Sequence, residues 1–141
     1  AITDPLGGVR QIEYSEAKLP TSFTDDLGKV VTFEHDARGN LISFTDALGH
    51  ETALAYDAHD NLIQRTNALG KVWTYAYDAN HRLTSVTTPM LHETKLAYFA
   101  HGRLQTLEDA RGHSTSYEYD AHGNLTRVTD PMGKQIMRAY D

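Results

Sequence analysis

The chain has 141 residues, a formal net charge of −6 at pH 7 and no cysteine. The missing cysteines exclude disulfides and thiolate-held metals. The charges are spread without a basic block and no long apolar segment occurs. We therefore expect neither nucleic acid nor an anionic membrane as a partner, and no membrane insertion by this segment.

The sequence repeats itself every 21 residues, without insertion or deletion. A residue type that recurs at one position of successive repeats is called a sequence ladder here, such as the tyrosine ladder. The tyrosine ladder comprises Tyr14, Tyr56, Tyr77, Tyr98, Tyr119 and Tyr140, with His35 in the remaining place, and the glycine ladder comprises Gly7, Gly28, Gly49, Gly70, Gly112 and Gly133, broken only at Leu91. A fixed period of this length indicates stacked supersecondary units. Residues 1–141 are predicted to form a single array of about seven repeats, with partial repeats at both ends. We expect the array to be an excerpt of a longer chain.

Each repeat predicts the same elements in chain order. A four-residue corner such as Asp-Pro-Leu-Gly at residues 4–7 is followed by a strand that ends on the ladder tyrosine, then by a second corner and a second strand. In residues 71–91, the runs VWTYAY and LTSVTT are rich in β-branched and aromatic residues and enclose DANH, which is typical of a β-hairpin. No segment has helical periodicity, so we expect an all-β, antiparallel β-hairpin repeat array of about 13 strands.

The corners account for the glycines. Asp at the first position, Pro at the second and Gly at the fourth are typical of a type I turn followed by a left-handed residue. Asp60 and His81 replace the glycine in two corners, and both residue types accept positive φ. Lys18 and Leu91 fit less well, so we expect their two corners to be strained or differently shaped.

The strand before the ladder tyrosine has a less polar face. Its alternate positions hold, for example, Trp73, Tyr75 and Tyr77, which predicts a sheet with one side more apolar than the other. The residues of the second strand are harder to assign to the two faces of the sheet, because Leu83 and Val86 lie an odd number of residues apart. This spacing predicts a bulge or bend between them.

The histidines favour no metal site. Most of them occupy two repeat positions: His50, His92 and His113 after the turn glycine, and His59, His101 and His122 inside the other corner. Equivalent residues in neighbouring repeats should lie about 10 Å apart, since two strands separate them at about 4.8 Å each. Ligands of one Zn²⁺ lie within about 4 Å of each other. We therefore interpret these histidines as solvated turn residues and predict no metal.

The sequence indicates no catalytic residue and no cofactor. Each repeated aspartate has a local task as a turn former, and a hydrolytic carboxylate pair should be singular rather than recurrent. No GxSxG motif and no glycine-rich phosphate loop leading into a helix occurs. We therefore predict that the chain is not an enzyme.

The aromatic residues leave two interpretations open. Trp73, Tyr75 and Tyr117 could form a sugar-stacking platform, as in a carbohydrate-binding or cell-surface adhesion module. Alternatively, the rings pack against neighbouring strands and fill the less polar face.

The repeat can be written Y-D-A-x-G-x-L-x-x-x-T-D-x-x-G, and this pattern resembles the YD repeat of the RHS family. Residues 119–133 match it throughout, and residues 35–49 match except for His35. The resemblance implies a β-sheet ribbon that winds spirally into a hollow shell, which in bacterial members such as polymorphic toxins and Tc toxin C components encloses a toxin domain. The family's self-cleaving segment carries a DPxGL-type sequence. Here Gly133 of the corner at 130–133 is followed by Lys134, and the corner at 4–7 by Gly8, so we assign no protease role.

From the resemblance we expect a non-catalytic shell segment that encloses and shields a toxin or other polypeptide. The expected partners are flanking RHS repeats of the same parent protein and the enclosed polypeptide. The expected location is secreted or at the surface of a bacterium. An isolated meander also has two open edges and one uncovered face, so we expect it to self-associate through those edges, to curl tightly or to be marginally stable.

Overall fold

The computed structural model describes residues 2–3 and 9–140, and every regular element within them is a strand. The chain divides into two compact units, Ala1–Val72 and Trp73–Asp141. The first unit contains β1 (Ile2–Thr3), β2 (Val9–Tyr14), β3 (Pro20–Thr24), β4 (Val30–His35), β5 (Leu41–Thr45), β6 (Glu51–Tyr56) and β7 (Leu62–Thr66). The second contains β8 (Val72–Tyr77, whose first residue closes the first unit), β9 (Leu83–Thr87), β10 (Glu93–Tyr98), β11 (Leu104–Glu108), β12 (Ser114–Tyr119), β13 (Leu125–Thr129) and β14 (Gln135–Met137).

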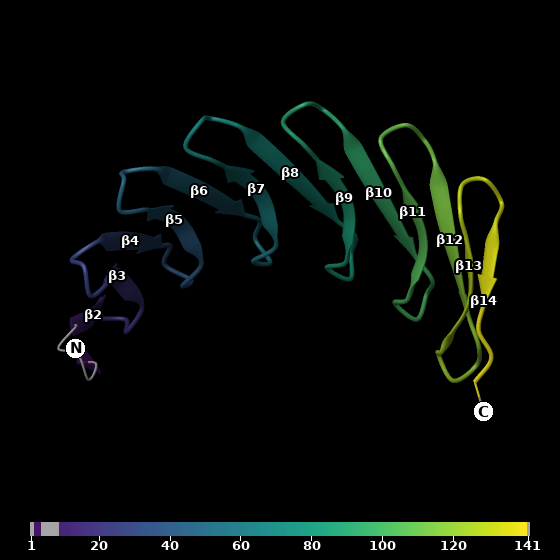
Figure 1. Cartoon of the computed structure of the whole chain (residues 1–141), viewed down its shortest axis with the longest axis horizontal. Helices are drawn as coiled ribbons and strands as arrows, with labels where there is room; N and C mark the ends of the chain where they lie inside the picture. Colours follow the sequence, from purple (N-terminus) through teal and green to yellow (C-terminus); the bar gives the residue numbers. More distant parts are fainter. Residues whose placement is uncertain (1, 4–8, 141) are drawn as a thin grey trace. The chain divides into compact units, whose positions relative to one another are not determined.

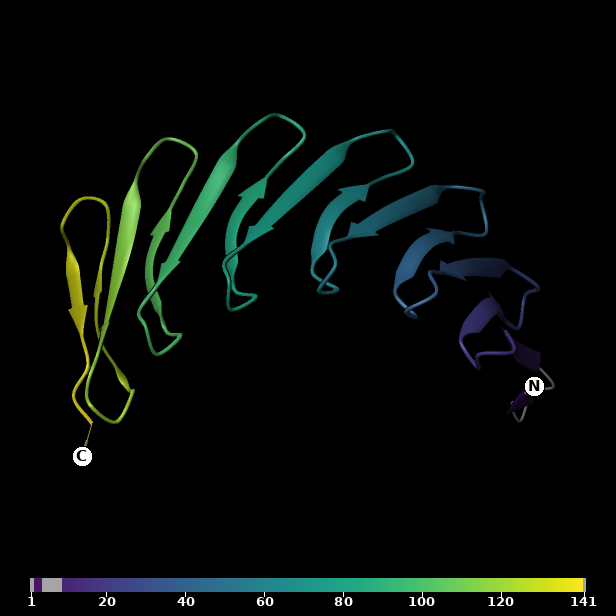
Figure 2. The same cartoon turned by 180° about the vertical axis from the view of Figure 1, so that it is seen from behind.

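Within each unit, every strand pairs antiparallel with the strand that follows it in the chain. The corners between strands therefore alternate between the two sides of the strand ribbon, as both views show (Figure 1, Figure 2). This confirms the predicted all-β antiparallel hairpin array. The part of the chain that the structure describes holds 14 strands against the expected 13. It also contains no helix long and apolar enough to cross a membrane.

The predicted bulge lies in the second strand of each hairpin. In β8 and β9, Tyr75 pairs with Val86 but Tyr77 pairs with Leu83, so one residue of β9 is skipped. Residues directly opposite each other in a ladder share a face of the sheet. Leu83 and Val86 therefore lie on the same face as the two tyrosines, although their spacing is odd. The residues skipped in this way are Thr21, Ile42, Ile63, Thr84, Gln105 and Thr126.

The two faces differ as the sequence predicted. Along β4 and β8, half-buried positions alternate strictly with exposed ones, and Phe33 and Tyr75 lie on the half-buried face. The opposite face is polar, and some of its side chains bond to each other across neighbouring strands. There Ser85 Oγ donates to Glu93 Oε1 at 2.6 Å, and Arg127 lies 3.0 Å from Glu118.

The less polar face has no covering layer among the residues whose side chains are placed. Among the side chains that are placed, no hydrophobic one is fully buried on either face. The only buried polar ones are Thr52 on the less polar face and Ser43 on the polar face, each 8% exposed. A domain normally buries its sheet against a second layer. Each unit is therefore a single sheet held by backbone ladders, cross-strand pairs and its corners.

Candidate functional site: two rows of corners

The corners form two classes, one on each side of the strand ribbon (Figure 1). Post-tyrosine corners follow the ladder tyrosine or His35 and comprise residues 15–19, 36–40, 57–61, 78–82, 99–103 and 120–124. Post-threonine corners follow a threonine that recurs every 21 residues, at Thr24, Thr45, Thr66, Thr87 and Thr129, or Glu108 in its place. They comprise residues 25–29, 46–50, 67–71, 88–92, 109–113 and 130–134. The corner at 4–7, with Gly7, lies outside the described residues.

All the described corners share one geometry. In the corner at 46–50, the Asp46 N–H donates to the carbonyl of His50 at 3.0 Å, and the Gly49 N–H donates back to the carbonyl of Asp46 at 2.9 Å. This pair of bonds closes a type I turn with a left-handed fourth residue. The turn chemistry predicted from the sequence is confirmed.

The fourth corner residue has positive φ even where it is not glycine. Asp60 and His81 have φ of 63° and 60°, as predicted. Lys18 and Leu91 have φ of 61° and 60° and make the same turn hydrogen bonds at 2.9 Å. These two corners were expected to be strained or differently shaped, and their shape is the same because the hairpin register fixes the turn. Both corners are strained, because each holds a residue with a Cβ in left-handed backbone.

The first corner residue uses its side chain to close the turn. Asp46 Oδ1 accepts from the amides of Leu48 at 2.8 Å and His50 at 2.9 Å. The same double acceptance recurs at Asp25, Asp36, Asp57, Asn67, Asp78, Asp109, Asp120 and Asp130. The second carboxylate oxygen often bonds the side chain of the fifth residue, as Asp57 Oδ2 does with Asn61 Nδ2 at 2.8 Å.

These hydrogen bonds favour the ionised carboxylates. The amide of His50 holds the pKa of Asp46 below its ordinary value of 3.8, and the amide of Arg82 does the same for Asp78. At Asp57 the side-chain amide of Asn61 contributes most to the lowered pKa. Each effect arises because a donor stabilises the charged form.

The ladder tyrosine ties one repeat to the previous one. The Tyr98 hydroxyl donates to the carbonyl of Leu83 at 2.8 Å, and the Tyr140 hydroxyl donates to the carbonyl of Leu125 at 3.1 Å. Each bond joins a ladder tyrosine to the leucine fifteen residues earlier. Leucine also recurs every 21 residues, at Leu41, Leu62, Leu83, Leu104 and Leu125, so two residue types that recur separately in the sequence meet in the structure.

Neighbouring post-tyrosine corners are bonded to each other. In the first unit, Arg38 donates to the carbonyl of Asp57 at 2.9 Å and lies 3.0 Å from the Asp60 carboxylate. In the second unit, Arg82 donates to the carbonyl of Phe99 at 3.0 Å and lies 5.0 Å from the Tyr98 ring centre. Sequence reasoning did not single out these arginines. Arg82 recurs at the equivalent Arg103, whereas Arg38 has no arginine at the equivalent position of another post-tyrosine corner.

Post-threonine corners, apart from the one with Arg111, instead expose apolar tips at their third position. Leu27, Leu48 and Leu69 are 77%, 79% and 81% exposed in the first unit, and Met90 and Met132 are 76% and 95% exposed in the second. The same position of the post-tyrosine corners holds polar side chains, except for Ala17. The two sides of the ribbon therefore differ: one is polar and bonded between corners, and the other presents apolar tips.

The six histidines at the two repeat positions lie in exposed corners, as predicted. His50 and His113 each place Nδ1 close to the aspartate that begins their corner, at 3.0 and 3.1 Å. Among the described residues, no group of three or more His, Cys, Asp or Glu side chains could hold a metal ion.

His50→Ala should change the free energy of unfolding by no more than about 0.5 kcal/mol, because this side chain is exposed and its backbone amide remains. Urea unfolding of the variant beside the wild type checks this. A larger loss would mean that the exposed His50–Asp46 contact contributes far more than such pairs usually do.

The three candidate glycan-binding residues do not form one cluster. Trp73 and Tyr75 lie on the same half-buried face of β8, but Tyr117 lies in β12. Four strands at about 4.8 Å each separate them by roughly 19 Å. Tyr75 is paired with Val86 and Tyr117 with Val128, which favours cross-strand packing of these rings.

Comparisons with known proteins agree with the repeat. The sequence profile described as RHS Repeat matches residues 14–51, 35–70, 56–89 and 98–135. No curated protein matches the chain.

Solved structures share the fold. A crystal structure of TcdB2-TccC3 without its hypervariable C-terminal region has 17% identity and a TM-score of 0.74, over 99% of this chain and 9% of that one. The TcdB2-TccC3-Cdc42 crystal structure has 17% identity and a TM-score of 0.69, over 91% and 9%. A Photorhabdus luminescens Tc holotoxin pore has 23% identity and a TM-score of 0.63, over 72% and 5%. The chain thus spans less than a tenth of each.

Proposed function

The chain belongs to the RHS-repeat family, and on that premise we propose that it is a non-catalytic segment of an RHS shell that encloses and shields another polypeptide. The names of the similar structures identify components of Tc toxin complexes, which supports a toxin as the enclosed polypeptide. Residues 1–141 would act as one array within a longer wall, with flanking repeats of the parent protein as neighbours. Its site of action would be outside a bacterial cell or at the cell surface.

The observation that carries the proposal is the uncovered single sheet. In each unit the less polar face is continuous and only half-buried. Polar side chains of the other face bond to each other across neighbouring strands. A wall one sheet thick needs this construction, because it must separate two spaces without a second layer. The recurrent bonds between post-tyrosine corners would stiffen one margin of such a wall.

Limited proteolysis of the parent protein tests the enclosure. The enclosed polypeptide should survive a protease concentration that digests the same polypeptide expressed alone, because a closed wall excludes the protease. Equal digestion rates would contradict the proposal. The proposal would also be contradicted if the purified segment turned over a substrate and a single substitution abolished that turnover.

A further inference from the structure

The apolar tips of the first unit form an uninterrupted row. Leu27, Leu48 and Leu69 occupy the same position of three successive post-threonine corners, and each is more than three-quarters exposed. A large apolar side chain at the tip of an exposed turn gains nothing from the fold itself. Repetition of such side chains at one edge marks an interaction surface.

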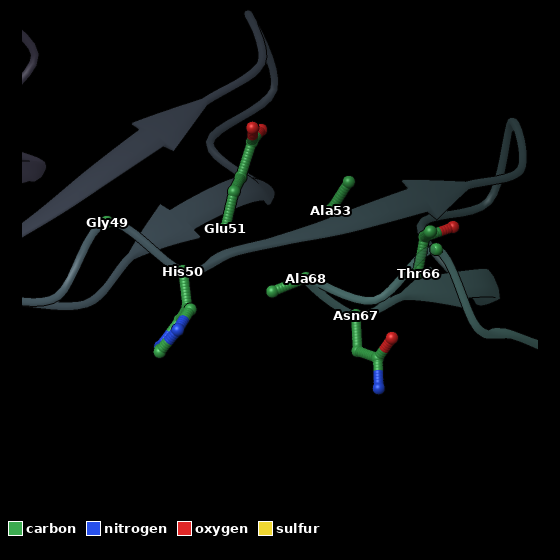
Figure 3. Close-up of a pocket in the computed structure, with 8 residues that line it drawn as sticks. Gly49, His50, Glu51, Ala53, Thr66, Asn67 and Ala68 are labelled. Atoms are coloured by element: carbon green, nitrogen blue, oxygen red, sulfur yellow. The ribbon is translucent and has the colours of Figure 1, made fainter.

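A hollow lies between two of these tips. It separates the corners at 46–50 and 67–71 and has a volume of about 410 Å³. Half of its lining is small, from Gly49, Ala53, Ala68 and Gly70, and the other half is polar, from His50, Glu51, Thr66 and Asn67. In Figure 3, His50 and Asn67 point to one side of the β6 strand and Glu51 points to the other, which leaves the small residues between them. The hollow exceeds the roughly 150 Å³ of a cavity that holds benzene, so a leucine side chain can enter it.

We infer that this row binds the same row of a second copy of the chain, antiparallel, with Leu48 of each copy inserted into the hollow of the other. The arrangement is self-complementary, because each copy presents both the Leu48 tip and the hollow beside it. Such a two-fold contact is the commonest form of homodimer interface. The inference concerns one edge of the ribbon and does not depend on the proposed enclosure of a polypeptide.

The charges of the three corners fit the antiparallel orientation. Inserting Leu48 in this way places Leu69 and Lys71 of one copy between the corners at 25–29 and 46–50 of the other. Each of those two corners has a formal charge of −1, whereas the corner at 67–71 has a charge of +1. A parallel arrangement with the two rows in register would instead place each corner opposite the same corner of the other copy, and therefore opposite a charge of the same sign. Complementary charges fix register and orientation more than affinity.

The size of the surface indicates a weak dimer. Three five-residue corners contribute 15 residues from each copy, whereas a standard stable interface uses about 20 to 30 residues a side. We therefore expect a dissociation constant in the micromolar range rather than an obligate dimer.

Sedimentation velocity over a micromolar-to-millimolar concentration series tests the inference. Wild type should show a monomer–dimer equilibrium, and Leu48→Arg should weaken it by at least about tenfold, because it removes the central anchor. Arginine occupies the same corner position at Arg38 and Arg111, so the variant should keep the wild-type circular dichroism spectrum. Met132→Arg, at the equivalent tip of the second unit, is the matched control and should leave the dimer intact.

A charge exchange gives a second readout that does not depend on the leucine. Lys71→Glu should weaken the dimer, and adding Asp26→Lys should restore it, since Asp26 is not the residue that closes its turn. A monomer at every concentration would overturn the inference, as would a dimer that Leu48→Arg leaves unchanged. Loss of the dimer through Ile136→Arg in β14 but not through Leu48→Arg would assign the association to the open sheet edge instead.

Discussion

Gly49→Val should lower the free energy of unfolding by roughly 1 to 3 kcal/mol, because it forces a β-branched residue into left-handed backbone. Gly49 has φ of 83°, and no atom lies within 4 Å of the position a Cβ would take. The loss should therefore come from backbone strain alone, without a steric clash. Urea unfolding at one fixed protein concentration measures it, because self-association would otherwise shift the midpoint.

Gly70→Val should behave like Gly49→Val, since Gly70 has φ of 69° and the same open surroundings. Leu91→Gly is the reverse control and should stabilise by up to about 1 kcal/mol, because it relieves a leucine held at positive φ. A Gly49→Val variant as stable as wild type, or less destabilised than His50→Ala, would show that the corner does not require left-handed backbone.

The sequence predicted the features that depend on a few adjacent residues. The turn chemistry follows from the residue types at the first and fourth corner positions, so positive φ at Asp60 and His81 could be expected. The bulge between Leu83 and Val86 followed from their odd spacing, although only the pairing showed which face they share. Family membership followed from ladders that need no structure at all.

Features that join one repeat to the next could not be predicted. Leu91 adopts the glycine conformation because the flanking strands fix the turn, so tertiary context overrides a local preference. The bond from Arg38 to the corner at 57–61 depends on the side-chain conformation of a long residue, which a period does not determine. The apolar row of Leu27, Leu48 and Leu69 was visible in the sequence as a repeated position, but turn chemistry does not require it.

Acidification should destabilise the array, because its corner carboxylates titrate below their ordinary value in the folded chain. The lowered pKa values belong to Asp36, Asp46, Asp57, Asp78, Asp109 and Asp120. At Asp36, desolvation opposes the shift and the hydrogen bonds from Asn40 and Arg38 outweigh it. The unfolded chain binds protons at these residues near the ordinary value of 3.8, before the folded chain does. Their contribution to stability is therefore complete above that value and is lost as pH falls through the lower folded values.

The urea midpoint should accordingly fall between about pH 5 and pH 2.5. Asp57→Asn is the matched control, because Asn67 already closes a corner with a neutral side chain through amide bonds of 3.0 and 2.9 Å. The variant should fold and lose part of the pH dependence, since the residue that closes its turn no longer ionises. A midpoint that stays constant over this range, or an Asp57→Asn variant that keeps the full pH dependence, would mean that the ionised corner carboxylates do not support the fold.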